Sequence, residues 1–198
     1  MVESSALSPV PTLRTPRLVL VPLGPEHLED VWAGLHDEES NRLTGTRTVF
    51  TREVVAAHLE RIGPADDRAD WAITLPDGTY VGEVVLNELD EDDRCMNVRI
   101  ALVPGMPGRG YGTEAMVAVL DHAFDAVGLH RVELSVFDFN PRAQRSYQKA
   151  GFVVEGRQRD RLRWDGRWHD SILMAVLATD PRPGIARSSD DDTPPVTA

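Results

Sequence analysis

The residues that most clearly suggest a chemical function form a glycine-rich turn, Pro107–Thr113, with the sequence PGRGYGT. An apolar run precedes the turn and an amphipathic pattern follows it, which predicts a strand, a turn and a helix in succession. Glycines let the backbone approach an anion, and the N–H groups at a helix N-terminus attract one. The turn lacks the Gly-Lys-Ser/Thr ending of nucleoside triphosphatases and the G-x-G-x-x-G spacing of dinucleotide sites. It therefore predicts another kind of phosphate or pyrophosphate site, with a ligand-free turn as the alternative.

A second strand-to-helix junction follows at Asn140-Pro141, where asparagine suits the helix N-cap and proline the first helical position. Two successive junctions of this kind create a crevice at the strand ends where a ligand can lie. The elements that position them are predicted from periodicity and turn residues. They are a strand at 17–22, helices after Pro25 and Thr51, strands at 71–75, 79–86 and 96–103, a helix at 112–127, a strand at 130–137, a helix at 140–149, and two further strands joined by Asp165-Gly166.

This order of elements predicts an α/β (α+β) sheet flanked by helices. A length of 198 residues suits one domain, which we place at residues 13–178. Residues 1–12 are small, polar and proline-rich, which predicts a flexible N-terminus. Residues 179–198 have little apolar surface to bury, which predicts a disordered acidic tail.

The composition argues against several classes of function. A formal net charge of -11 disfavours a nucleic-acid partner. The sequence has neither an apolar run of membrane-spanning length nor the layout of a signal peptide, so we expect no membrane partner and a cytoplasmic location. Cys95 is the single cysteine, which excludes an internal disulfide, and the six scattered histidines show no metal-ligand spacing. We therefore expect no metal.

Two motifs in the second half of the chain resemble those of the GNAT N-acetyltransferase superfamily. The first is the pyrophosphate loop Q/R-x-x-G-x-G/A, which matches residues 107–112. The opening residues 13–18 also resemble the branch that contains the ribosomal-protein N-terminal (alanine) acetyltransferases. The second motif, N-x-x-A-x-x-x-Y-x-K-x-G-F, is present as Asn140, Ala143, Tyr147, Lys149, Gly151 and Phe152.

The resemblance implies a mixed, mostly antiparallel sheet of about seven strands flanked by about four helices, with acetyl-CoA as co-substrate. It implies that Leu102 and Val103 contact the pantetheine arm and polarise the thioester carbonyl, and that Asn140 bonds the same arm. The pyrophosphate would be held by Gly108, Arg109, Gly110, Gly112 and Thr113.

Tyr147 is the predicted catalytic residue, because a phenol can return a proton to the departing thiolate. The sequence departs from the family pattern at Pro107, which replaces a Gln or Arg, and at Ser135, where some relatives carry a glutamate base. The base is therefore left open between Glu83 and Ser135 acting through water.

The resemblance implies an acetyl-CoA-dependent N-acetyltransferase that works by direct transfer in a ternary complex. The alternative is a catalytically silent acyl-CoA-binding sensor. The acceptor is expected to be an amine-bearing small molecule or a protein N-terminus, and a homodimer is left open. The acidic runs 37–39 and 88–93 are candidates to attract a cationic acceptor, and the hairpin at 164–170 is a candidate wall of its site.

Overall fold

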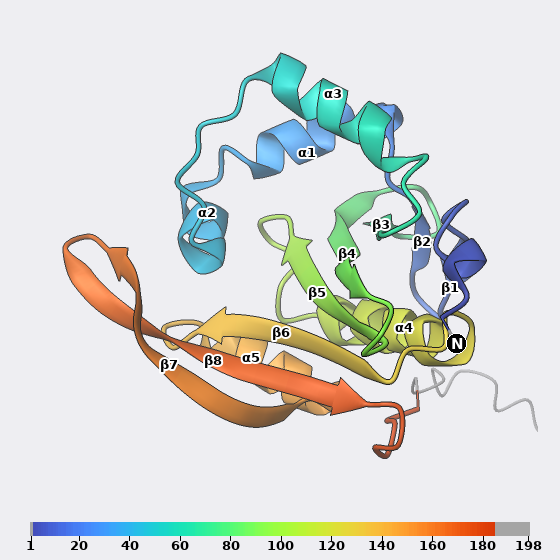
Figure 1. Ribbon diagram of the computed structural model, residues 1–198. Coiled ribbons are helices and arrows are strands. Elements are labelled where there is room, and N and C mark those ends of the chain that lie inside the picture. The colour runs from blue at the N-terminus through green and yellow to red at the C-terminus, as the bar shows by residue number, and fades with distance from the viewer. Residues whose placement is uncertain (1, 185–198) are drawn as a thin grey trace, which may run out of the picture.

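The computed structural model describes residues 2–184 and contains one mixed sheet of eight strands (Figure 1). The strand order is β1-β2-β3-β4-β5-β6-β8-β7, and only the β5–β6 pair is parallel. The predicted mostly antiparallel sheet is confirmed, with a short extra strand at its edge. The strands are β1 (Leu13–Arg14), β2 (Val19–Pro22), β3 (Ala69–Thr74), β4 (Tyr80–Asp90), β5 (Cys95–Leu102), β6 (Arg131–Phe137), β7 (Val153–Trp164) and β8 (Arg167–Leu177).

Helices cover both sides of the sheet: α1, α2 and α3 lie on one side, and α4 and α5 lie on the other (Figure 1). None of those in the described part of the chain combines the length and hydropathy needed to cross a bilayer. The helices are α1 (Leu28–Gly34), α2 (Glu38–Thr44), α3 (Arg52–Ile62), α4 (Tyr111–Asp125) and α5 (Pro141–Lys149), with short 3-10 turns at η1 (Ser4–Ala6) and η2 (Pro25–His27).

Helix α2 is the helix that the sequence analysis missed, and it raises the helix count from about four to five. The Asp37 side chain caps it by accepting a hydrogen bond of 2.7 Å from the Ser40 N–H. Gly45 ends it with a left-handed φ of 70°. Part of the acidic run 37–39 is therefore helical, because acids in the first turn suit the helix dipole.

The two faces of the central strands have different roles. Side chains alternate along a strand, so Trp71, Val84 and Val98 all point to the side of α4 and join the main core. The next residues along β4 and β5, such as Glu83 and Arg99, point to the side of α1 and α3. A smaller apolar cluster lies there around Leu59. One face of the sheet is thus filled, and the other borders a cavity.

Strands β5 and β6 separate soon after they meet. They pair only from Cys95 opposite Arg131 to Asn97 opposite Glu133. Beyond this point β5 continues to Leu102 and β6 to Phe137 without pairing to each other. Since α4 follows β5 and α5 follows β6, the two predicted junctions lie on either side of the gap.

The N-terminal segment differs from the flexible stretch that we expected over residues 1–12. Leu7 is fully buried in the main core. The Trp71 indole donates a hydrogen bond of 2.7 Å to the Pro11 carbonyl, and a His122 ring nitrogen lies 3.0 Å from the Ala6 carbonyl. One large apolar side chain and these polar contacts order an otherwise polar segment.

The predicted acidic tail, residues 179–198, is described only as far as residue 184, and the rest lies outside the described residues. Within the described part, Arg182 forms ion pairs with Asp121 and Asp125 on α4.

Candidate active site

The glycine turn adopts the conformation that its composition predicts. Gly108 and Gly110 have φ values of 90° and 85°, in the left-handed region that glycine tolerates best. Gly110 is the N-cap of α4, so the N–H groups of the first helical turn are exposed to a ligand. A side chain at Gly110 would also approach the Arg17 guanidinium to 3.1 Å.

A cavity of about 290 Å³ lies at the end of β5, where this strand has separated from β6, and the glycine turn forms one wall. The second wall is α5, which contributes the three cationic side chains of Arg142, Arg145 and Lys149. Backbone N–H donors opposite cationic side chains suit a phosphorylated ligand. The predicted site residues that line the cavity are Leu102, Gly108, Gly110, Gly112, Thr113, Asn140 and Tyr147.

Sequence reasoning missed part of this cavity. Ser40, Leu43 and Thr44 of α2 line it, although α2 is about sixty residues from the glycine turn in sequence. The cationic residues of α5 could have been found, because a helix that begins at Asn140 brings positions three and four apart onto one face.

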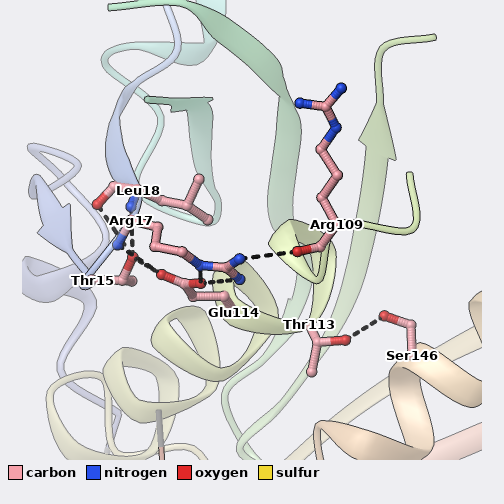
Figure 2. Close-up of polar contacts among 7 residues, drawn as sticks. All are labelled: Thr15, Arg17, Leu18, Arg109, Thr113, Glu114 and Ser146. Carbon is pink, nitrogen blue, oxygen red and sulfur yellow. Dashed lines mark hydrogen bonds and ion pairs between the residues drawn. The ribbon is translucent and has the colours of Figure 1, made fainter. Parts of the chain in front are cut away.

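Two predicted cofactor residues do not point into the gap. Arg109 is exposed, does not line the cavity, and extends away from Glu114 and Thr113 (Figure 2). The Val103 N–H donates to the Val81 carbonyl at 3.0 Å, and the residue borders a different cavity. Because strand N–H groups point alternately to the two neighbours, those of Leu102 and Ile100 face the gap. Leu102 thus keeps the predicted position for a backbone donor, and Val103 does not.

A buried carboxylate fixes the start of α4 (Figure 2). Glu114 is 8% exposed and accepts hydrogen bonds from the Thr15 hydroxyl at 2.6 Å and the Arg17 backbone at 3.0 Å. The Arg17 guanidinium forms an ion pair with it at 2.6 Å and donates to the Arg109 carbonyl at 3.0 Å. The segment before β2 therefore holds the glycine turn in place.

Polar contacts also fix the helix starts around the gap. The Asn140 Oδ1 accepts a hydrogen bond of 3.1 Å from the Ala143 N–H, which leaves the other half of this amide as a donor on the cavity wall. The Thr113 and Ser146 hydroxyls lie 2.7 Å apart and join α4 to α5 (Figure 2).

Tyr147 lies in the cavity wall beside Phe152, with the two ring centroids 6.0 Å apart. Burial raises the pKa of its phenol to about 12. The hydroxyl has no hydrogen-bond partner within residues 2–184. The group is therefore protonated near neutral pH and available as a donor.

A second cavity of about 700 Å³ lies between the sheet and helices α1 and α3. It shares Thr44, Ile100 and Ala101 with the first cavity, so the two meet at β5. Glu83 pairs with Ala101 across the strands and lines this cavity. Burial, and then the nearby charge of Asp70, raise the pKa of the Glu83 carboxyl.

The other candidates for the acceptor side lie elsewhere. Ser135 is exposed on β6 and lines neither cavity. The acidic run 88–93 covers the end of β4 and the turn that follows it, and none of its residues borders either cavity. The hairpin at 164–170 borders neither cavity. Of the two candidates for the base, only Glu83 lines a cavity.

Comparison with known proteins agrees with this geometry. A profile described as the Acetyltransferase (GNAT) domain matches residues 17–153. The Bacillus subtilis protein YjcK, which is named as an N-acetyltransferase, is 40% identical over 130 residues, covering 65% of this chain and 72% of YjcK. A spermidine N(1)-acetyltransferase from Vibrio cholerae is 31% identical over 113 residues, covering 56% of this chain and 65% of that enzyme.

The fold is also that of a known structure. The crystal structure of Vibrio cholerae spermidine N-acetyltransferase in complex with CoA and spermine superimposes with a TM-score of 0.78 at 21% identity, and covers 83% of this chain and 97% of that one. The separated strands, the glycine turn and the matched profile lead to one assignment. The chain belongs to the GNAT acetyltransferase family, whose members use acetyl-CoA.

Proposed function

We propose that this protein transfers the acetyl group of acetyl-CoA to the primary amine of a small molecule, by direct attack within a ternary complex. The observation that carries the proposal is that two cavities meet at Ile100 and Ala101. One has the backbone donors and cationic side chains that a pyrophosphate needs. The other has a carboxyl group of raised pKa beside the meeting point.

In the proposed reaction Glu83 takes a proton from the substrate ammonium, and the neutral amine attacks the thioester carbonyl carbon. The Leu102 N–H supports the developing oxyanion. The carbon–sulfur bond then breaks, Tyr147 donates its proton to the departing thiolate, and the resulting tyrosinate takes the excess proton from the amide nitrogen. Direct attack needs no acetyl-enzyme, and Cys95 lies outside both cavities.

The test is thiol release from acetyl-CoA in the presence of a panel of primary amines, run with wild type and Tyr147→Phe. Loss of a positioned general acid costs about 10²-fold or more in turnover. We expect such a loss in the variant, with CoA affinity within about twofold of wild type, because the ring remains.

Two results would contradict the proposal. A Tyr147→Phe variant with unchanged turnover would show that the phenol is not the acid. Tight binding of acetyl-CoA without thiol release for any amine would favour the silent acyl-CoA-binding alternative.

A further inference from the structure

The charged side chains of the second cavity limit which class of acceptor can bind there. Its ionisable walls contain three arginines and two carboxylates, together with His58. Asp70 is held by Arg68 in a double hydrogen bond of 2.6 and 2.7 Å, so it already has a cationic partner. The Arg61 guanidinium donates to His58 Nδ1 at 2.9 Å, and burial lowers the pKa of this imidazole, which favours the neutral ring.

One cation in this cavity lacks a protein partner. Arg99 forms no ion pair or hydrogen bond through its side chain within the described residues, yet it lines the cavity. Strand register places Glu83 opposite Ala101, and Asp70, Val85 and Arg99 in the adjacent row across β3, β4 and β5. Rows of side chains on one face are two residues apart, or about 7 Å. Arg99 is therefore one row from the meeting point of the two cavities.

Helices α1 and α3 lie over this face of the sheet (Figure 1). The rest of the cavity lining is mainly apolar, with Thr44, Thr46 and Asn87 as uncharged polar residues. A polyamine carries several ammonium groups, each of which needs an anionic or polar partner. Here Glu83 is the only carboxylate on the cavity wall, among residues 2–184, without a paired arginine. The apolar residues that line it are Leu23, Val31, Leu35, Phe50, Val54, Val55, Ala57, Leu59, Val85, Ile100 and Ala101.

From this arrangement we infer that the acceptor is an amino-acid-like amine, whose carboxylate pairs with Arg99 while its amine faces Glu83 and its apolar side chain fills the cavity under α1 and α3. The inference rests on the proposed function for its chemistry and specifies the substrate class of that site. The carboxylate of such an acceptor would pair with the Arg99 guanidinium. A polyamine has no carboxylate, so its ammonium groups would face this guanidinium as charges of the same sign.

The test compares L-phenylalanine, L-leucine and L-methionine with their carboxamides and with spermidine, using thiol release from acetyl-CoA. We expect kcat/KM to be about 10- to 100-fold higher for each amino acid than for its amide, because a hydrogen bond to a charged group is lost. Arg99→Gln should remove this preference by raising KM for the amino acids much more than for the amides. Arg99→Lys should restore part of it, and Arg94→Gln, an exposed arginine outside both cavities, is the matched control.

A binding experiment distinguishes the proposed acetyl transfer from the inferred amino-acid-like acceptor. Calorimetric titration of L-phenylalanine into the CoA-loaded protein should show binding that Arg99→Gln weakens about tenfold or more. Binding of this kind without turnover would overturn the proposed reaction and support the acceptor class. Turnover of spermidine or of the amides at rates equal to or above those of the amino acids would overturn the acceptor class and leave the proposed reaction intact.

Discussion

At the scale of single residues, the two proposed proton-transfer groups have pKa values shifted in directions that suit their roles. Burial raises the pKa of Tyr147 to about 12, so the phenol keeps the proton that a departing thiolate needs. Burial also raises the pKa of Glu83, which makes the carboxylate a stronger base. The nearby negative charge of Asp70 raises this pKa further, whereas the positive charges of Arg99 and Arg68 lower it in part.

The raised pKa of the Glu83 carboxyl predicts how kcat/KM falls on the acid side of its pH profile. A base works only when deprotonated, so kcat/KM should fall as pH drops through a pKa above the ordinary glutamate value of 4.5. Glu83→Gln should lower kcat/KM by about 10²-fold and remove this limb. Measurement of kcat/KM from pH 5 to 9 checks this. An unchanged limb in the variant would assign it to the ionisation of the substrate amine instead.

At the scale of elements, the start of α4 depends on contacts from a segment about a hundred residues earlier. Local patterns predicted the turn and the helix, because Gly108, Gly110 and an acid in the first turn act through the backbone next to them. They could not predict that Glu114 bonds Thr15 and Arg17, since this contact depends on the order of the strands. The cavity wall from α2 was missed for the same reason, although its capping residues were visible in the sequence.

Loss of the Glu114 contacts should destabilise the fold. Glu114→Gln removes the charge that satisfies Arg17, and we expect a loss of about 1–3 kcal/mol in the free energy of unfolding, measured in urea. The matched control is Glu29→Gln, which breaks an exposed pair with Arg52. It should cost about 0.5 kcal/mol or less. Equal effects of the two substitutions would contradict a structural role for Glu114.

The left-handed conformation of the glycine turn gives a separate prediction. Gly110→Ala should cost about 1–2 kcal/mol of stability and weaken CoA binding, because its φ is 85° and its Cβ would crowd Arg17. Gly34→Ala is the control, since a side chain there meets nothing within 4 Å. It should be neutral or slightly stabilising in thermal unfolding. Normal CoA affinity in Gly110→Ala would argue against the turn as the phosphate site.

At the scale of the whole molecule, the sequence predicted the family fold but not how the two cavities join. The order of elements and the two motifs were sufficient for a mixed sheet with helices on both sides. The placement of Glu83 and Arg99 on one face required the register of β4 against β5, which alternation within a single strand does not supply. The same register places both side chains near Ala101, where the cavities meet.

A ligand that bridges the gap should stabilise the whole protein. At 100 times its Kd, a ligand that binds only the folded state adds about 2.7 kcal/mol. We expect CoA to raise Tm accordingly. Amides that exchange through global unfolding should slow in every strand, and local exchange along β5 after Asn97 should slow in addition. The absence of any extra slowing in β5 relative to β2 would contradict binding within the gap.

The short pairing of β5 with β6 has a consequence for solubility. Beyond Asn97 and Glu133 the two strands do not pair with each other, so each offers an unpaired row of peptide groups toward the interior of the sheet. Such rows accept any extended chain that fits, and the pantetheine arm of CoA, with its amides, is one such chain. We therefore expect bound CoA to cover these rows and hinder β-type self-association, so that the ligand-free protein aggregates faster than the CoA-bound one.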